Sequence, residues 1–292
     1  MNTLIEVRDL AKTFTLHQQH GVSLQVLRGL SFTVSAGECL VLHGQSGAGK
    51  STLLRTLYGN YLPAGGSIRI RHAGDWLELV GAEPRQVLAV RRQTLGYVSQ
   101  FLRVIPRVPA LEVVMEPALA RGWSRADAEA RAKALLTRLN ISERLWQLAP
   151  GTFSGGEQQR VQLARVLCQV WVPVLDGVPR FLFLDEPVSS LDIRHQLLIM
   201  DVARRYADAG GGVVVVLHDL NLASMYADHI VALRDGRVAG AGAPQSVLTD
   251  ALLARVFDCP LRVGAMPSRA IPFVLPQSVQ SSAPSVPASK VA

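Results

Sequence analysis

The chain has 292 residues, 49% of them hydrophobic and 18% charged, which is enough for one large domain or two small ones around a sizeable core. Its cysteines, Cys39, Cys168 and Cys259, are scattered, so the sequence excludes a disulfide framework or a cysteine-based metal site and fits a reducing compartment. The net charge of +7 comes from arginines spread along the chain without interleaved aromatic residues, so we expect no nucleic-acid partner.

The N-terminal segment, "MNTLIEVRDL", has no basic region followed by a long apolar run, so we expect no signal peptide. No stretch approaches the roughly 20 apolar residues that span a bilayer. The strongest apolar run, "VVVVL" at 213–217, has the length of a strand. Work at a membrane is therefore expected to require a separate membrane subunit.

Residues 1–42 alternate apolar and polar side chains in "LIEVRDL" and "LSFTV" and end in the apolar "CLVLH". This pattern predicts a small antiparallel sheet that leads into a buried strand. After a glycine-rich loop at 44–51, "STLLRTLYG" predicts a helix closed by Gly59, and "GSIRIRH" at 66–72 returns to strand alternation.

The loop "GQSGAGKS" at 44–51, called the phosphate loop below, has the complete spacing of a phosphate-binding motif and stands between an apolar strand and a helix. Gly47 and Gly49 let the backbone wrap around phosphate oxygens. Lys50 places a positive charge beside the β- and γ-phosphates, and Ser51 offers a hydroxyl to Mg²⁺.

The strand "YVSQ" at 97–100 ends in Gln100, whose amide oxygen is placed to reach Mg²⁺ or the attacking water. From about 102 to 150 the pattern changes to helix, and "SRADAEARAKALLTRLN" carries Ala and Leu at helical spacing with Ser124 as its N-cap. We interpret about 101–160 as a helical subdomain inserted into a larger domain.

A second anion-binding loop follows in "GTFSGGEQQR" at 151–160. A helix that starts at Ser154, Gly155 and Gly156 directs unpaired backbone N–H groups and a partial positive charge outward, which suits an anion. One chain thus carries two such cradles, which raises the question of what the second one binds.

Functional side chains follow two buried strands. "FLFLDEP" at 181–187 delivers Asp185 and Glu186 at the carboxyl end of an apolar strand, where the ligands of parallel sheets bind. We expect Asp185 to hold Mg²⁺ directly or through water, and Glu186 to act as general base for the attacking water. His218 ends the second strand, "VVVVLH", and is a candidate sensor of the γ-phosphate.

Apolar strands that alternate with helices predict a parallel sheet covered on both faces. The predicted fold class is α/β, with a small antiparallel β-subdomain, a parallel-sheet core and the helical insertion. We place the main domain at 1–250 and a C-terminal extension at 251–263. Pro, Ser and Val dominate from residue 264 onward, so we expect 264–292 to be a disordered tail.

Six motifs occur in the order typical of an ABC-type ATPase, namely the phosphate loop, Gln100, "SGGEQ" at 154–158, "LDEP" at 184–187, "SSLD" at 189–192 and His218. Over about residues 3–250 the chain resembles the nucleotide-binding subunit of this superfamily of P-loop NTPases. The resemblance implies ATP and Mg²⁺ as cofactors and ATP hydrolysis as the reaction. Phe153 and Glu157 depart from the family pattern, in which Leu and Gln are commoner.

The resemblance assigns catalysis to Glu186, His218 and Gln100, and the metal to Ser51, Gln100 and Asp185. It implies that Phe14 stacks on adenine, where Tyr is more usual. The other ATP contacts that it implies are Gly44, Gln45, Ser46, Gly47, Ala48, Gly49, Lys50, Ser51, Thr52, Ser154, Gly155, Gly156 and Asp192.

The resemblance also implies what the second loop binds. In this family the loop at 154–158, called the signature loop below, caps the γ-phosphate held by the phosphate loop of a second subunit, and "SSLD" lies at the dimer interface. A second copy of the chain, or a paralogous ATPase, then packs head to tail with the first around two ATP molecules. Hydrolysis and phosphate release remove those contacts and open the dimer.

The two halves of the chain predict different cargo. Residues 1–160, with "TFTLHQQHG" and "VSQFLRVIPRVPALEVVMEP", resemble an ATPase of the phosphonate carbon–phosphorus lyase system, whereas residues 162–280, with "HDLNLASMYAD", resemble the ATPase of a haem (hemin) importer. A natural recombination or an artificial chimera would give this pattern. Because the face that docks a partner subunit, about 100–150, lies in the first half, we favour the phosphonate system, with haem import nearly equal.

The expected partners are therefore membrane permease subunits or soluble phosphonate-lyase subunits. A soluble, non-transport ABC ATPase is a further alternative, which predicts no membrane association. A regulatory GTPase is excluded because the chain lacks an Asn-Lys-x-Asp segment. As an importer subunit, the chain would be cytoplasmic and peripheral on the inner face of the cell membrane.

Overall fold

The structure is a computed structural model that describes residues 2–16, 22–100, 106–266 and 272–278. Its strands are β1 (Thr3–Leu16), β2 (Val22–Ser35), β3 (Cys39–Gly44), β4 (Gly65–His72), β5 (Asp75–Glu78), β6 (Leu95–Val98), β7 (Val174–Leu175), β8 (Val178–Pro179), β9 (Phe181–Asp185), β10 (Gly212–Val216), β11 (His229–Arg234) and β12 (Arg237–Gly242). Its α-helices are α1 (Lys50–Leu57), α2 (Pro84–Gln93), α3 (Ala110–Leu119), α4 (Arg125–Arg138), α5 (Gly155–Val170), α6 (Ile193–Asp208), α7 (Leu220–Tyr226), α8 (Pro244–Val247) and α9 (Asp250–Phe257). Short 3₁₀ helices are η1 (Glu143–Leu145), η2 (Pro150–Thr152) and η3 (Pro276–Ser278).

The central sheet has the strand order β12-β11-β3-β10-β9-β6, in which every pair is parallel except β11 with β12. Val216 pairs with Leu42 on one side and with Asp185 on the other, so the carboxyl ends of β3, β10 and β9 are in line. The residues that follow these three strands therefore meet at one edge of the sheet.

The apolar runs that predicted buried strands face two separate cores. Val213 and Val215 of β10 lie in the core formed with α3 to α7, whereas Val214 and Val216 lie in the core that includes α1 and the antiparallel sheet β2-β1-β4-β5. Side chains of a strand alternate between faces, so a strand that is buried on both faces must be apolar at every position. The predicted α/β class, with its antiparallel β-subdomain, parallel core and helical insertion, is confirmed.

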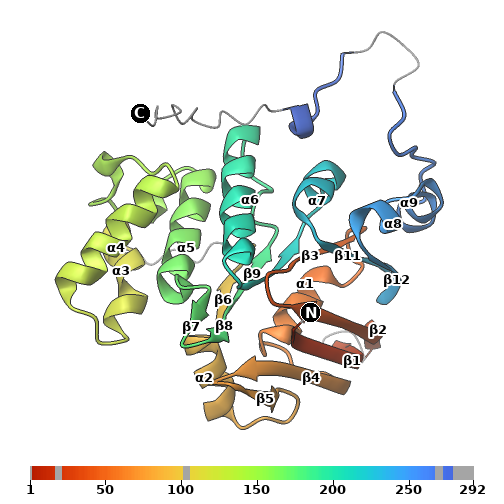
Figure 1. Cartoon of the computed structure of the whole chain (residues 1–292), viewed down its shortest axis with the longest axis horizontal. Coiled ribbons are helices and arrows are strands. Elements are labelled where there is room, and N and C mark those ends of the chain that lie inside the picture. The colour runs from red at the N-terminus through yellow and green to blue at the C-terminus, as the bar shows by residue number, and fades with distance from the viewer. Residues whose placement is uncertain (1, 17–21, 101–105, 267–271, 279–292) are drawn as a thin grey trace, which may run out of the picture.

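The helical insertion stands beside the sheet (Figure 1), where α3 and α4 both pack against α5. Ser124 caps α4 by accepting a hydrogen bond from the backbone N–H of Asp127, as predicted from the sequence. Gly59 follows α1 with a φ of 75°, the left-handed conformation that ends a helix. The predicted insertion begins at 101–105, which lie outside the described residues.

The predicted tail is only partly described. Within it, Pro276–Ser278 form η3, and the Gln277 side chain donates hydrogen bonds to Asn221 Oδ1 (3.2 Å) and Ser224 Oγ (3.3 Å) on α7. Disorder of 264–292 stays a prediction, and within the described part Gln277 has partners on a helix that the sequence pattern does not connect with it. Residues 267–271 and 279–292 lie outside the described residues.

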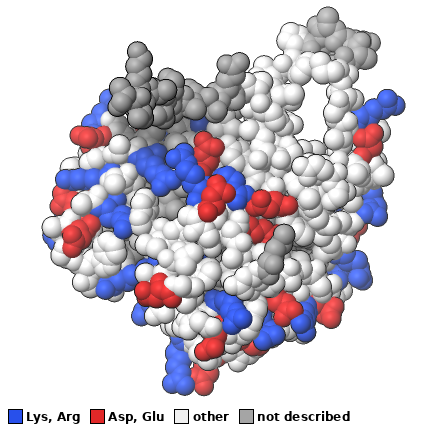
Figure 2. Space-filling view, viewed as in Figure 1, with Lys and Arg blue, Asp and Glu red and all other residues white. Residues whose placement is uncertain are grey.

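On the face shown in Figure 2, basic and acidic side chains are interspersed and form no single basic field. In the part of the chain that the structure describes, none of the helices has both the length and the apolar character needed to cross a membrane.

Candidate nucleotide-binding and hydrolysis site

The phosphate loop connects the end of β3 to the start of α1, and its glycines are required by its geometry. Gly44 has a φ of 141°, and an added Cβ there would lie 2.2 Å from the carbonyl oxygen of Leu233. Gly49 has a φ of 100° and caps α1, where an added Cβ would lie 2.9 Å from Leu27. Side chains at these positions would strain the backbone or displace a neighbouring strand.

The concave side of the loop is open. Gly47 has a φ of 80°, and an added Cβ would meet no atom within 4 Å. The side chain of Lys50 lies along the loop, where Nζ donates hydrogen bonds to the carbonyl oxygens of Gly44 (2.8 Å) and Gln45 (2.7 Å). Burial lowers the pKa of Lys50, and the carboxylates of Glu186 and Asp185 oppose this shift. The loop thus holds a positive charge against backbone that is shaped for an anion.

The rest of the loop is exposed at Gln45, Ser46 and Gly47 and buried at Ala48. The side chain of Gln45 reaches the C-terminal extension, where Nε2 donates a hydrogen bond to Asp258 Oδ2 (3.3 Å).

Asp185, at the carboxyl end of β9, is fully buried. Its Oδ2 accepts a hydrogen bond from the Tyr97 hydroxyl (3.0 Å) and lies 3.7 Å from Arg55 Nε. Burial, with a contribution from the Asp185 charge, raises the pKa of Tyr97 to about 12, so this hydroxyl remains a donor at neutral pH. Asp185 Oδ1 is buried and has no hydrogen-bond partner among the described residues. A buried carboxylate oxygen without a donor is suited to a hard cation such as Mg²⁺.

The three predicted catalytic residues converge. Gln100 Nε2 donates to Glu186 Oε2 at 2.8 Å, and His218 Nε2 donates to Glu186 Oε1 at 2.8 Å. The side chain of Glu186 is 14% exposed and that of His218 is 47% exposed, so solvent reaches the carboxylate from the His218 side. Residues from the ends of three different strands therefore meet on one carboxylate, as the parallel sheet requires.

Glu186 is also fixed through its backbone. It has a φ of 52°, which is uncommon for a residue with a side chain, and its carbonyl oxygen accepts a hydrogen bond from Gln159 Nε2 (3.1 Å) on the buried face of α5. Strain of this kind is frequently found at active sites. The sequence analysis missed Gln159 and Tyr97. The signal for Gln159 was a polar residue on the apolar face of a helix, and that for Tyr97 was its place on the strand beside Asp185.

The signature loop is stabilised by hydrogen bonds within the first turn of its own helix. Ser154 is the N-cap of α5, and its Oγ accepts a hydrogen bond from the Glu157 backbone N–H, while Glu157 Oε2 accepts one from the Ser154 N–H (2.9 Å). The Ser154 hydroxyl also donates to Glu157 Oε2 (2.8 Å), and this hydrogen bond, followed by that from the Ser154 N–H, lowers the pKa of Glu157. Ser154 and Gly155 are exposed, and an added Cβ at Gly155 would meet no atom within 4 Å.

The "SSLD" segment lies against the signature loop, since an added Cβ at Gly156 would be 2.8 Å from Leu191 Cδ2. Asp192 caps α6 by accepting a hydrogen bond from the His195 N–H (2.9 Å), and its side chain is 64% exposed. Among the residues described, no hydrogen bond or ion pair joins Ser154 or Asp192 to the phosphate loop. The structure therefore does not bring these two predicted ATP contacts to the chain's own phosphate loop.

Phe14 of β1 lies edge-on to Tyr61, with ring centroids 5.2 Å apart, and Lys12 Nζ is 4.6 Å from its centroid. The residue is partly exposed, and a positive charge lies over its ring.

The fold and this site define a P-loop nucleotide hydrolase. The family model described as "ABC transporter" matches residues 27–189. Proteins named "Hemin import ATP-binding protein HmuV" from Mesorhizobium japonicum and Rhizobium meliloti are 45% and 44% identical to the chain, over 94% and 87% of its length and 99% and 94% of their own. A solved structure entitled "Dimeric structure of a post-hydrolysis state of the ATP-binding cassette MJ0796 bound to ADP and Pi" has a TM-score of 0.73 and 27% identity, and covers 82% of this chain and 99% of that one.

The chain belongs to the ABC transporter family and is an ATPase subunit that binds and hydrolyses ATP. The phosphonate interpretation is not supported. One relative aligns over 94% of the chain and 99% of its own length, so a single ancestry accounts for both sides of the signature helix and no recombination or chimera is needed. The motifs within 1–160 that suggested phosphonate chemistry are therefore no guide to the cargo.

Proposed function

We propose that the chain is the energy-coupling ATPase of a hemin importer, and that it works as a head-to-tail dimer at the inner face of the cell membrane. The main support for hydrolysis is the carboxylate of Glu186, which is held by Gln100 and His218. The main support for a dimer is the signature loop, since no described residue outside its own helix forms a hydrogen bond with the Ser154 side chain. The cargo is supported by the names of relatives that align with nearly the whole chain.

The chain's own residues carry the hydrolytic step. The backbone N–H groups of the phosphate loop and the Lys50 ammonium bind the phosphates, which orients the γ-phosphate for attack. Glu186 accepts a proton from the attacking water, a new P–O bond forms, the bond between the β- and γ-phosphates breaks, and ADP and phosphate are the products. His218 and Gln100 hold the carboxylate in position through one hydrogen bond to each oxygen. Ser51, Gln100 and Asp185 are the residues that would hold Mg²⁺, which neutralises phosphate charge when bound.

The second half of each site is proposed to come from a second copy of the chain. Ser154 and Gly155 are exposed at the positive end of α5, a helix of 16 residues, so their N–H groups suit a γ-phosphate supplied from outside. Asp192 lies on the same surface as part of the "SSLD" segment. The similar cassette was solved as a dimer in a post-hydrolysis state, which supports this arrangement.

A groove beside the helical insertion is the proposed docking site for the permease. It has a volume of about 450 Å³ and lies between the end of α1, α2, α3 and α5, with Tyr58, Leu88, Pro117 and Arg165 among its lining residues. Leu88 is 48% exposed, so the groove offers apolar area to a partner. Its position between the sheet and the insertion lets a docked subunit contact both.

The test is capture of the closed dimer from gently solubilised cells. Tagged Glu186→Gln protein with ATP and Mg²⁺ should retain a polytopic membrane protein, and Lys50→Ala protein, which lacks the phosphate-binding charge, should not. The same complex rebuilt in liposomes with the wild-type chain should then show ATPase activity that rises when a hemin-loaded binding protein is added. Capture of soluble enzymes alone, or activity indifferent to hemin, would contradict the import function.

A further inference from the structure

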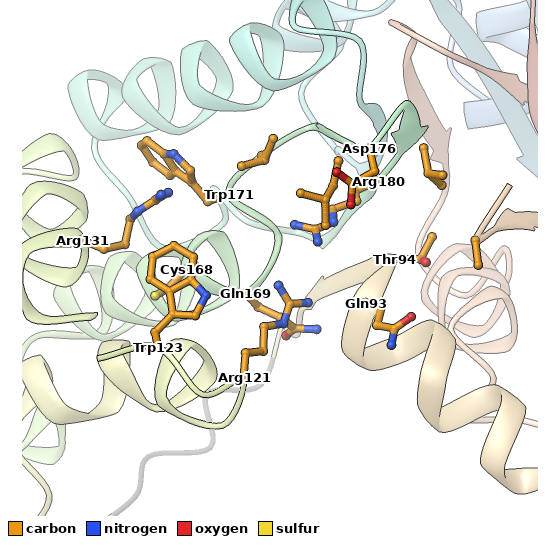
Figure 3. A pocket seen from close by; sticks show the side chains of 14 residues that line it. Gln93, Thr94, Arg121, Trp123, Arg131, Cys168, Gln169, Trp171, Asp176 and Arg180 are labelled. Atoms are coloured by element: carbon orange, nitrogen blue, oxygen red, sulfur yellow. The ribbon is translucent and has the colours of Figure 1, made fainter. Parts of the chain in front are cut away.

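A cavity of about 680 Å³ lies between the helical insertion and the sheet (Figure 3). Its walls come from the α3–α4 connection, α4, the end of α5, the β7–β8 hairpin and the residues that precede β6 and β9. Thr94 and Arg180 stand directly before β6 and β9, so the cavity lies at the amino edge of the sheet. Glu186 and His218 follow the carboxyl ends, so the cavity, called the arginine–tryptophan pocket below, is separate from the hydrolysis site.

The charge of this pocket is strongly unbalanced. Its lining includes Arg121, Arg131 and Arg180, whereas Asp176 is the one acid among the lining residues. Arg121 and Arg180 extend from opposite walls toward the centre of the pocket (Figure 3). Burial lowers the pKa of Arg121, and the charge of Arg180 adds to this shift, so the two guanidinium groups affect each other. Burial raises the pKa of the Cys168 thiol, which therefore adds no negative charge.

Two of these arginines are incompletely paired, and one of them has a buried atom without a partner. Arg180 is only 7% exposed, and no hydrogen bond or ion pair joins its guanidinium to any residue that the structure describes. Arg131 Nη1 is buried and likewise has no hydrogen-bond partner there. Burying a charged donor without a partner is costly, and an anion in the pocket would remove that cost.

On the opposite wall the charged guanidinium of Arg131 stacks on two tryptophan rings. The Arg131 guanidinium lies 4.4 Å from the ring centroid of Trp171 and 5.2 Å from that of Trp123. Trp123 is 42% exposed, and Val172 and Leu175 on the rim are 38% and 41% exposed. Exposed apolar side chains gathered around a cavity are typical of a binding site for a ligand with apolar surface.

We propose that the arginine–tryptophan pocket binds a planar, largely apolar ring ligand that carries two or more carboxylates, the chemistry of a dicarboxylate porphyrin. The ring would lie beside the exposed side chains of Trp123, Val172 and Leu175. The carboxylates would pair with Arg180 and with Arg121, whose Nη2 also donates a hydrogen bond to the Arg92 carbonyl oxygen, since guanidinium forks match carboxylates. The volume is in the range of sites for ligands of this size. The choice of a porphyrin rests on the proposed hemin import. The inference goes beyond that function, because it concerns contact between the ATPase chain itself and the ligand.

The test is a titration of the purified full chain with deuteroporphyrin IX, followed by quenching of tryptophan fluorescence and by porphyrin absorbance. The dimethyl ester of the same porphyrin has the same ring without the charges. The chain should bind the dicarboxylate at least about tenfold more tightly than the ester, because each charge-assisted pair is lost. Hemin should bind with similar affinity to the metal-free ring, since the pocket recognises the ring and its carboxylates.

Three variants and one control sharpen the test. Arg121→Gln and Trp123→Ala, both at exposed positions, should each weaken binding about tenfold, as should Arg180→Gln if it folds. Arg262→Gln removes an exposed arginine far along the chain and should leave binding unchanged. Equal binding of acid and ester, binding of hemin alone, or variants that bind normally would overturn the proposal. None of these outcomes depends on whether the chain drives import.

Discussion

The phosphate loop and the signature loop are both glycine-rich turns that open a helix, yet the chain completes only one of them. Around the phosphate loop, Lys50 is held by two carbonyl oxygens and Glu186 by Gln100 and His218. At the signature loop, the Ser154 side chain is exposed and, among the described residues, forms hydrogen bonds only within its own helix. The phosphate loop and its catalytic carboxylate thus have hydrogen-bonded side chains from their own chain. The signature loop instead has exposed N–H groups, as expected if a second molecule binds them.

The two regions are nevertheless connected. Gln159 belongs to the helix that the signature loop opens, and it donates its hydrogen bond to the carbonyl oxygen of Glu186. Its Oε1 is buried without a partner among the described residues. A shift of α5 on contact with another subunit would therefore act directly on the backbone that carries the catalytic carboxylate, because buried hydrogen bonds transmit displacement.

The largest expected effect is on kcat, from a substitution at the hydrolysis site beside the phosphate loop. Glu186→Gln removes the proton acceptor but keeps a side chain that can bond to Gln100, so kcat should fall about 10²–10⁴-fold, or about 3–5 kcal/mol. ATP binding should be nearly unchanged. Steady-state phosphate release and nucleotide titration measure the two quantities. The exposed Glu129→Gln is the control, and a loss of activity below threefold in Glu186→Gln would remove Glu186 as general base.

The next effect tests whether the signature loop acts on a second molecule and not on its own chain. An added methyl at Gly155 meets nothing within its own chain, so Gly155→Ala should raise the free energy of unfolding by about 0.4–1 kcal/mol. In a dimer the same methyl would stand between the α5 N–H groups and the partner's γ-phosphate, and ATPase activity should fall about 10–100-fold.

Thermal unfolding and an ATPase assay at high protein concentration check these opposite signs. Gly65→Ala, at another glycine with open space around its Cβ position, is the matched control and should leave activity unchanged. If Gly155→Ala retains full activity, the signature loop does not approach a nucleotide and the half-site arrangement is wrong.

Acid should lower the free energy of unfolding through His43, which lies beside the phosphate loop. His43, beside the phosphate loop, is 2% exposed, and its burial lowers its pKa from an ordinary 6.5 to about 4. Between these values the unfolded chain binds a proton that the folded chain does not, so stability is present above pH 6.5 and is lost as pH falls toward 4. At pH 5 the loss attributable to His43 is about 2 kcal/mol.

Urea unfolding of the wild type and His43→Gln at pH 7 and pH 5 measures this difference. Nδ1 of His43 donates to the Leu217 carbonyl oxygen (2.7 Å), which the Gln amide can imitate, so the variant should lose less stability between the two pH values. His229→Gln, at a less buried histidine, should follow the wild type. Parallel pH profiles for His43→Gln and the wild type would show that His43 is not the titrating group.

The chemistry of both loops was predictable because it is local. Glycines beside Lys50 determine a phosphate cradle within a few residues, and Asp185 and Glu186 follow from their place at the end of an apolar strand. Contacts across the fold were not predictable. Tyr97 reaches Asp185 from another strand and Gln159 reaches Glu186 from a helix, and their residue types alone do not indicate these partners.

The preference for phosphonate as cargo is not supported, for a related reason. The motifs around 13–21 and 98–117 that favoured the phosphonate system lie in a domain whose parts are alike in all members of the superfamily, so short segments discriminate poorly between them. Whole-length similarity decides the matter in favour of one ancestry. Likewise, Arg121, Trp123 and Arg180 are distant in sequence, and only the packing of the insertion against the sheet brings them around one cavity.

The smallest expected effect comes from removing a single charge of the signature loop, that of Glu157. Glu157 stands where Gln is commoner in the family, and its carboxylate accepts from both the N–H and the hydroxyl of Ser154. Glu157→Gln should lower the free energy of unfolding by less than about 1 kcal/mol, since the cap keeps an acceptor but loses its charge at the helix N-terminus. In the proposed dimer the same change removes a negative charge close to the partner's γ-phosphate, so ATP-driven dimerisation should become tighter.

Sedimentation of Glu157→Gln in the Glu186→Gln background, with and without ATP, measures the second effect, and thermal unfolding of the free chain measures the first. We expect the free energy of unfolding to fall and dimerisation to tighten. The first depends on the capped helix, whereas the second depends on charges that come together only across an interface. A dimer that weakens along with the helix would mean that Glu157 is remote from the nucleotide. The signature loop would then contact ATP, if at all, through the backbone N–H groups of Gly155 and Gly156 alone.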